Sequence, residues 1–208
     1  MNTIFVFLIL SGMVTTGYLT TVCNRCWSLD STACCTEKEV QCDGSQCMML
    51  SEYCNISNVI YNSVKKTCAI ESMCNGCFSV STNRDFFHRV SGECGYGDYS
   101  NADMEYKELC HDLLSPNGYK CPSCYIKGST EGCTSKEMVL CRGNELECID
   151  YRGVFQLPSS DVMATSVKAC ITKGGCELGF KAAVGAKEIN GVMMKCTPAI
   201  PVHSAGDQ

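Results

Sequence analysis

The chain has 208 residues, of which 20 are cysteines, and a formal net charge of −5 at pH 7. A cysteine content near a tenth is typical of disulfide-stabilised proteins, which occur in oxidising compartments outside the cytosol. The acidity lies in the first half, with 7 basic and 12 acidic residues over 18–109, against 10 and 9 over 115–208. This balance argues against a nucleic-acid partner and favours a basic protein partner.

The first element in chain order is an apolar run, Ile4 to Val14, followed by small and polar residues around Gly17. Its length suits the hydrophobic region of a signal peptide and falls short of the roughly 20 residues that cross a bilayer. We expect residues 1–21 to be the signal peptide, with cleavage before Val22. The later sequence offers no membrane anchor, so a secreted, extracellular protein is predicted.

The cysteines repeat once in the same order, at offsets of 98 to 102 residues. The first set is Cys23, Cys26, Cys35, Cys42, Cys47, Cys68, Cys74 and Cys94. The second set is Cys121, Cys124, Cys133, Cys141, Cys148, Cys170, Cys176 and Cys196. A fixed period indicates an internal duplication. We predict two domains, unit 1 (22–112) and unit 2 (119–208), joined by a linker over 113–118.

Short segments between the cysteines are rich in β-branched and aromatic residues, as over 59–67, 78–82 and 147–155, and predict β-strands. In each unit, intervals of 19 to 21 residues separate the fifth cysteine from the sixth and the seventh from the eighth. Such intervals suit hairpins that leave a cross-linked base and return to it. Units this small need disulfides to support their cores, so the fold class is all-β and disulfide-rich.

Four cysteines have no counterpart: Cys34, Cys54, Cys77 and Cys110. Adjacent cysteines bond only with strain, so Cys34 needs a partner other than Cys35. One arrangement pairs Cys54 with Cys77 and Cys34 with Cys110. The alternative is that Cys110 links two chains into a homo-oligomer.

The remaining motifs favour no chemistry. Three Cys-x2-Cys pairs have the spacing of metal or redox motifs, but an oxidising compartment favours disulfides. Cys110, His111 and Asp112 put a nucleophile beside a base, although sequence neighbours seldom reach catalytic geometry. We predict no enzyme activity and no cofactor.

A binding protein needs exposed apolar anchors, because a few large side chains carry most of the energy of an interface. The candidates near the hairpin tips are Tyr61, Phe86, Phe87, Phe155 and Leu157. Packing in the core is the alternative for each. An acidic cluster would steer a basic partner or be merely solvated; its members are Asp98, Asp103, Glu105, Glu108 and Asp112.

A glycosylation sequon, Asn55-Ile56-Ser57, lies in the interval that forms the middle hairpin of unit 1. In a secreted chain it predicts a glycan on Asn55 and an exposed hairpin tip.

The cysteine frame resembles the three-finger domains of the lymphocyte-antigen-6 and urokinase-receptor superfamily. In such domains an adjacent Cys-Cys, four residues and Cys-Asn close the module, and here Cys94, Gly95, four residues, Ser100 and Asn101 occupy that frame. Gly95 and Ser100 thus replace both members of one disulfide, and Thr197 shows the corresponding loss in unit 2. The resemblance implies two tandem three-finger domains of the snake-toxin type.

The resemblance also implies a disulfide pairing that spacing alone cannot supply. In unit 1 the pairs are Cys23 with Cys47, Cys26 with Cys35, Cys42 with Cys68, and Cys74 with Cys94. In unit 2 they are Cys121 with Cys148, Cys124 with Cys133, Cys141 with Cys170, and Cys176 with Cys196.

Within the superfamily, residues 115–125 and 141–155 look like the gamma-type phospholipase A2 inhibitors of vertebrate plasma. This implies a secreted, non-enzymatic protein that binds and inhibits secretory phospholipase A2. The family's linking segment is proline-rich, whereas here residues 105–118 contain only Pro116. The alternatives are a soluble three-finger ligand or modulator of a cell-surface receptor and, as a third class, a structural protein of a secreted matrix, because fold does not settle function.

Overall fold

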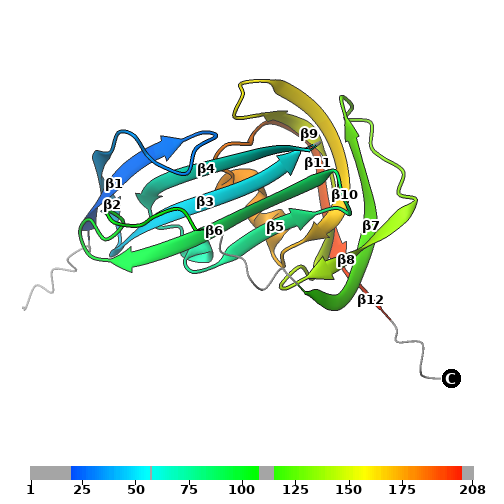
Figure 1. Ribbon diagram of the computed structural model, residues 1–208. Coiled ribbons are helices and arrows are strands. Elements are labelled where there is room, and N and C mark those ends of the chain that lie inside the picture. The colour runs from blue at the N-terminus through cyan, green and yellow to red at the C-terminus, as the bar shows by residue number, and fades with distance from the viewer. Residues whose placement is uncertain (1–19, 57, 108–114, 203–208) are drawn as a thin grey trace, which may run out of the picture.

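The structure is a computed structural model that describes residues 20–56, 58–107 and 115–202, and almost all of its regular elements are strands (Figure 1). The predicted all-β class is confirmed. Most of the predicted signal peptide, Ser57 of the sequon, Glu108, Cys110, His111 and Asp112 lie outside the described residues. In the part that is described, no helix combines the length and apolar character needed to span a bilayer.

Six strands belong to unit 1 and six to unit 2. Unit 1 contains β1 (Thr20–Ser28), β2 (Lys38–Asp43), β3 (Gln46–Ile56), β4 (Val59–Cys68), β5 (Cys77–Ser81) and β6 (Phe86–Tyr96). Unit 2 contains β7 (Pro116–Lys127), β8 (Glu137–Arg142), β9 (Glu147–Gln156), β10 (Val162–Ile171), β11 (Lys187–Pro198) and β12 (Ile200–Pro201). The short helices are η1 (Glu71–Met73), α1 (Gly175–Leu178) and η3 (Gly179–Ala182). β7 therefore begins inside the segment predicted as a linker.

The middle hairpin of each unit forms as its cysteine interval predicts. β3 and β4 pair from Cys47 opposite Cys68 to Ile56 opposite Val59. β9 and β10 pair in the same way, with Cys148 opposite Cys170 near the base. Each hairpin therefore starts at a cysteine and ends at a turn next to solvent.

The third hairpin forms in unit 1, from β5 and β6, but not in unit 2, where the prediction is wrong. After Cys176 the chain continues through α1 and η3 before it enters β11. The cause is Phe180, whose ring centroid lies 4.8 Å from that of Phe155 and 4.9 Å from that of Tyr151. Burial of this aromatic ring keeps the segment against the core. If the segment formed a solvent-exposed hairpin strand instead, the ring would be left in water.

The two units share one sheet, because β10 of unit 2 pairs with β5 of unit 1. The strand order is β11-β9-β10-β5-β6-β3-β4-β1-β2, with β7, β8 and β12 off this path. In Figure 1 the strands of unit 1 form one twisted layer and those of unit 2 curl around one end of it. At the junction, the Ser79 N–H donates to Thr172 Oγ1 over 2.8 Å.

The main core is built from both units. Its large members from unit 1 are Met48, Leu50, Met73, Phe78 and Phe86. Its large members from unit 2 are Ile149, Tyr151, Phe155, Met163 and Phe180. Because hydrophobic burial is the main source of folding stability, each unit depends on the other for part of its stability.

Glu52, on β3, is a buried carboxylate that ties unit 1 to unit 2. Its Oε1 lies 2.7 Å from His88 Nε2, and its two oxygens accept the N–H groups of Val184 and Gly185 over 3.0 and 2.6 Å. Burial raises the pKa of Glu52, but His88 and the two N–H groups lower it by more, so that it lies below its ordinary value. The charged form therefore holds the loop of unit 2 in place.

Glu145, just before β9, makes the converse connection. It accepts the hydroxyl groups of Ser79 and Ser81 on β5 over 2.7 and 2.8 Å, and the Arg142 N–H over 3.0 Å. Burial is the dominant influence here and leaves the pKa of Glu145 above its ordinary value. Two buried carboxylates, one from each unit, thus cross the junction in opposite directions.

Eight disulfides join cysteines within the described part of the chain. In unit 1 they are Cys23–Cys47, Cys26–Cys34, Cys42–Cys68 and Cys74–Cys94. In unit 2 they are Cys121–Cys148, Cys124–Cys133, Cys141–Cys170 and Cys176–Cys196. Seven of these are the pairs that the family resemblance implies.

The expected pairing of Cys26 with Cys35 is wrong, and so are both extra bridges. Cys26 bonds to Cys34, which excludes a Cys34–Cys110 bridge and leaves Cys35 as an exposed thiol. Cys34 is half-buried and reaches Cys26 on β1, whereas Cys35 lies at a bend of the loop and is exposed.

A Cys54–Cys77 bridge is excluded by the strand order. Cys54 is a free, buried thiol on β3, and its burial, followed by the charge of Glu52, raises its pKa. Cys77 is itself disulfide-bonded and begins β5, which β6 separates from β3. Two strand spacings amount to about 10 Å, more than a disulfide can span.

Candidate binding surface

Four of the five predicted anchors lie in the interior. Tyr61, Phe86, Phe155 and Leu157 are buried members of the core shared by both units. Phe86 stacks on Tyr125 of unit 2 with ring centroids 5.6 Å apart. Tyr61, Phe86 and Phe155 lie on strands, where alternation turns every second side chain toward one face. The prediction placed them at exposed hairpin tips and gave this alternation no weight.

Phe87 is the exception, because it follows Phe86 on β6 and points to the opposite side of the sheet. It is half-buried beside Tyr53, with ring centroids 5.1 Å apart, and the Arg89 guanidinium carbon lies 4.2 Å from its ring centroid. We call this side of β4, β3 and β6, away from the shared core, the outer face of unit 1.

Rows of side chains on the outer face follow from the strand register. Met49 of β3 lies opposite Lys66 of β4 and Glu93 of β6. Four residues further along β3, Tyr53 lies opposite Asn62 and Arg89. Directly opposite residues of antiparallel strands project to the same side, so these rows form one continuous surface.

The segment 102–107, which follows β6, lies over this surface. The Lys107 N–H donates to Ser51 Oγ over 3.3 Å, and Tyr106 Oη donates to Asn62 over 2.9 Å. Lys107 also forms an ion pair with Glu93 at 2.8 Å. The segment therefore crosses from β6 to β4 on the side opposite the core.

Asn101 anchors the start of that segment. Its fully buried side chain accepts the Asn24 N–H over 3.0 Å and donates to the carbonyl groups of Asn24 and Met48 over 2.9 and 3.0 Å. One amide thus links β1 to β3. This residue is the closing asparagine of the three-finger frame, and its buried hydrogen bonds give that position a physical reason.

Gly95 and Ser100, which occupy the places of a disulfide in the three-finger frame that the sequence resembles, lie together in the structure. A β-carbon built on Gly95 would be 2.8 Å from the β-carbon of Ser100. Paired cysteines usually hold their β-carbons near 3.8 Å, so a bridge here needs only a small shift of the backbone.

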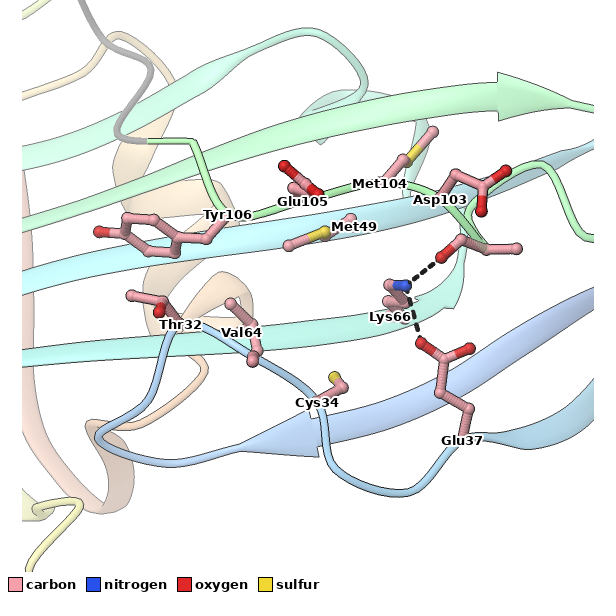
Figure 2. Close-up of a pocket in the computed structure, with 12 residues that line it drawn as sticks. Thr32, Cys34, Glu37, Met49, Val64, Lys66, Asp103, Met104, Glu105 and Tyr106 are labelled. Carbon is pink, nitrogen blue, oxygen red and sulfur yellow. Dashed lines mark hydrogen bonds and ion pairs between the residues drawn. The ribbon is translucent and has the colours of Figure 1, made fainter.

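The segment 102–106 and the loop before β2 enclose a cavity of about 610 Å³ on the outer face (Figure 2). We call it the acidic pocket. Its lining residues are Thr32, Ala33, Cys34, Glu37, Met49, Val64, Lys66, Ala102, Asp103, Met104, Glu105 and Tyr106.

Lys66 holds the two walls of the acidic pocket together. Its ammonium is 2.7 Å from Glu37 on one wall and 2.5 Å from the carbonyl oxygen of Ala102 on the other. Figure 2 shows Lys66 between Glu37 and the segment 102–106. Its charge is already paired with Glu37, and the other charged residues of the lining are Asp103 and Glu105, which are both exposed.

The predicted acidic cluster therefore separates into two parts. Asp103 and Glu105 line the pocket and are exposed. Asp98 instead accepts the Val22 N–H and the Thr21 hydroxyl, both over 2.8 Å, and these bonds lower its pKa. Asp98 thus secures β1.

No family model matches the chain. It is 28% identical over 178 residues to a gamma-type phospholipase A2 inhibitor of Laticauda semifasciata, an alignment that covers 82% of this chain and 93% of the relative. It is 30% identical over 141 residues to the phospholipase A2 inhibitor 25 kDa subunit of Naja kaouthia, with 67% and 73% covered.

The chain belongs to the phospholipase A2 inhibitor family. A further relative, phospholipase A2 inhibitor NAI of Notechis ater, is 29% identical over 167 residues, which are 78% of this chain and 80% of the relative. Among solved structures, mouse TEX101 is 21% identical, with a TM-score of 0.32 and coverage of 86% of this chain and 97% of that one.

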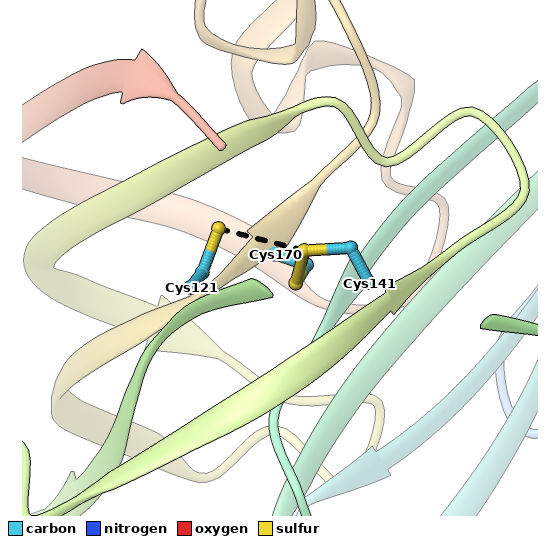
Figure 3. Close-up of side chains that lie close together, drawn as sticks. All are labelled: Cys121, Cys141 and Cys170. Carbon is cyan, nitrogen blue, oxygen red and sulfur yellow. Dashed lines mark hydrogen bonds between the residues drawn. A yellow bond between two sulfur atoms is a disulfide. The ribbon is translucent and has the colours of Figure 1, made fainter. Parts of the chain in front are cut away.

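The base of unit 2 in this inhibitor-family chain holds three sulfur atoms close together (Figure 3). They belong to Cys121, Cys141 and Cys170, and Cys121 Sγ lies 3.5 Å from Cys141 Sγ. All three are in disulfides, whereas metal binding requires thiolates. The cluster is therefore two crossing bridges that hold the base of the hairpins.

The predicted glycosylation site lies on the middle hairpin of unit 1. Asn55 is half-buried near the end of β3, and its Oδ1 accepts the Asn58 N–H over 3.1 Å. Glycosylation stays a prediction, and its site lies on the outer face at the end away from the acidic pocket.

Proposed function

We propose that this chain is a secreted, non-enzymatic binding protein that inhibits secretory phospholipase A2. The observation that carries the proposal is the similarity to named phospholipase A2 inhibitors over 82% of the chain. The apolar run near the N-terminus and the eight disulfides support an extracellular location.

The fold supports inhibition by binding. Strands tied at their bases by disulfides and packed on a core that both units share present a preformed surface. A surface of this kind loses little conformational freedom on association, which favours affinity. Binding that covers the active-site entrance or the lipid-contacting surface of the phospholipase would be sufficient to inhibit it.

The test is hydrolysis by a panel of purified secretory phospholipases A2, acidic and basic, with and without a molar excess of the secreted protein. We expect slower hydrolysis by at least one enzyme of the panel. Protein that has been reduced and alkylated serves as the control, because it keeps the sequence and loses the disulfides. Unchanged hydrolysis across the panel would refute the proposal.

A second substrate separates the two ways in which hydrolysis can slow. A protein that coats phospholipid vesicles also reduces hydrolysis without touching the enzyme. Inhibition that persists on a monomeric, water-soluble phospholipid supports binding to the enzyme itself. Inhibition confined to vesicles, together with sedimentation of the protein with those vesicles, would contradict it.

A further inference from the structure

We propose that the acidic pocket on the outer face of unit 1 receives a lysine or arginine side chain from a basic loop of the protein partner. This inference rests on the proposed function, in which the partner is a secretory phospholipase A2. It specifies which surface of the chain binds and which chemistry of the partner is recognised.

The lining of the pocket carries an excess of negative charge. Among the twelve described residues that line the pocket, Glu37, Asp103 and Glu105 are acidic and Lys66 is basic, which leaves two negative charges in excess. Glu37 is paired with Lys66 at 2.7 Å. The excess therefore belongs to Asp103 and Glu105. A hollow with low-dielectric walls focuses the field of such charges and attracts cations.

The shape and the apolar floor of the pocket suit a long side chain. The floor is apolar, formed by Met49 and Val64, and Met104 and Tyr106 contribute to one wall. The long aliphatic stem of lysine or arginine packs well on such side chains while its charged end reaches a carboxylate. A small inorganic cation would leave the apolar floor and most of the 610 Å³ without complementary contact.

The walls of the pocket are held in place before any partner binds. The two walls are already joined through Lys66, and segment 102–107 is held to the sheet by Lys107 and Tyr106. Asn101 secures the start of the same segment to β1 and β3. A bound side chain therefore enters a cavity that exists beforehand, which reduces the entropic cost of binding.

The outer face also supplies an apolar contact beside the pocket. Tyr53 and Phe87 lie there in a tilted ring contact, with centroids 5.1 Å apart, and both are half-buried. Tyr53 lies four residues from Met49 along β3, a distance of about 14 Å. A loop that puts a basic residue in the pocket can thus reach this apolar group, and an apolar contact with a charged neighbour is the usual composition of a protein interface.

The experiment compares two double variants with the same change of charge. The pocket variant, Asp103→Lys with Glu105→Lys, reverses two charges in the lining of the pocket. The unit 2 variant, Glu131→Lys with Glu177→Lys, reverses the charges of two exposed residues far from it in the sequence. Association with a basic secretory phospholipase is measured by surface plasmon resonance at 50, 150 and 500 mM NaCl on the intact protein. Thermal unfolding of each variant checks that it is folded.

We expect the pocket variant to associate about tenfold more slowly at 50 mM NaCl and to lose most of the salt dependence. The unit 2 variant should associate nearly as fast as the unchanged protein. Equal rates for both variants, with inhibition intact, would overturn the pocket proposal and leave the proposed function standing.

If the unchanged protein binds no phospholipase, the proposed function fails, and a separate measurement decides on the pocket. The ¹⁵N-labelled protein is titrated with the peptide acetyl-Phe-Arg-Phe-amide. Amide shifts that gather on residues 102–106, Val64 and Lys66 support a site for basic side chains. Shifts that are absent, or spread over both units, overturn it.

Discussion

Lys66 of unit 1 and Lys168 of unit 2 occupy equivalent positions, each two residues before the sixth repeated cysteine of its unit. The side chain of Lys66 is 7% exposed and pairs with Glu37 at 2.7 Å, whereas that of Lys168 is 29% exposed and lies 3.4 Å from Asp150. The residue that faces each lysine across the hairpin differs too, being Met49 in unit 1 and Asp150 in unit 2.

The cause of the difference is the path of the chain after the last long strand. In unit 1 the segment 102–107 returns over the outer face and covers the lysine. In unit 2 the chain continues from β11 to β12, which pairs with β7. Duplication thus preserves the strands and their disulfides, while the segment that leaves the sheet determines which surface can bind a partner.

The largest effect is expected at the junction, where Glu52 and Glu145 offer a second comparison of the units. Glu52→Gln should reduce the free energy of unfolding by about 3 kcal/mol, because it breaks a buried charged network. Glu145→Gln should cost much less, since burial already disfavours the charge of Glu145. Urea unfolding with intact disulfides, followed by far-ultraviolet circular dichroism, measures both.

The same two variants should respond to pH with opposite sign. The lowered pKa of Glu52 means that its stabilisation is present above 4.5, its ordinary value, and is lost as pH falls through the folded value. The raised pKa of Glu145 means that stability is lost as pH rises from 4.5 through the folded value. Parallel pH profiles for the two variants would contradict this assignment.

Asn101→Ala should cost about 3 kcal/mol, because it leaves several buried backbone groups without a partner. Asn117 is the matched control in unit 2, since its side chain donates to the carbonyl groups of Gly143 and Glu145 but is only half-buried. Asn117→Ala should cost about 1 kcal/mol. Amide hydrogen exchange over residues 102–107 should accelerate in the Asn101→Ala variant and not in the Asn117→Ala variant. If the amides of 102–107 are equally protected in both variants, Asn101 does not hold the pocket wall in place.

Restoring the missing bridge should stabilise unit 1. Gly95→Cys with Ser100→Cys closes a loop of few residues, which by chain entropy alone adds about 2 kcal/mol. Mass spectrometry of the unreduced protein verifies the bond, and urea unfolding measures the gain. The two single variants are the controls, and a double variant no more stable than either of them would show that the short contact between the β-carbons cannot relax.

Exchanging each equivalent lysine for methionine tests the role of the covering segment directly. Lys66→Met should cost about 1 kcal/mol, because Glu37 and the Ala102 carbonyl lose a shared partner in a partly buried site. Lys168→Met should change the free energy of unfolding by less than about 0.5 kcal/mol, because Lys168 is more exposed than Lys66 and lies farther from its partner. Equal values would mean that the covering segment does not depend on Lys66.

The cysteine frame and the residues between the cysteines were sufficient to predict the all-β class and the middle hairpins. The seven expected disulfides that the structure contains came from the family resemblance, because spacing alone leaves many pairings open. The frame did not predict which of Phe86 and Phe87 turns inward, because Phe86 packs on Tyr125 of the other unit. It did not predict the burial of Phe180 either, because that ring packs among Tyr151, Phe155 and residues of unit 1 that no local pattern brings together. The acidic pocket was foreseen only as an acidic cluster. Its walls depend on hydrogen bonds of segment 102–107 with residues that lie far away in the sequence.

The smallest expected effect concerns Cys34 and Cys35, where the duplicated frame and the structure disagree. Unit 2 closes the loop Cys124–Cys133, while unit 1 closes Cys26–Cys34 and leaves Cys35 as a free exposed thiol. Attack by the Cys35 thiolate on Cys26 Sγ would form Cys26–Cys35 and release Cys34 as a thiolate, without any oxidant. A loop longer by one residue changes the chain entropy by about 0.1 kcal/mol, so neither isomer is favoured on that ground.

We therefore expect both isomers in protein held at pH 8, detected by alkylation of the free thiol in acid followed by peptide mapping. Cys35→Ser should hold the Cys26–Cys34 bond and remove the second isomer, with little change in the urea midpoint. A non-reducing gel controls for disulfide-linked dimers through Cys35. Label found on Cys35 alone, even after prolonged incubation, would mean that contacts of Cys34 with the pocket wall favour the Cys26–Cys34 bond. Packing around this loop, and not its length, would then explain why unit 1 differs from unit 2.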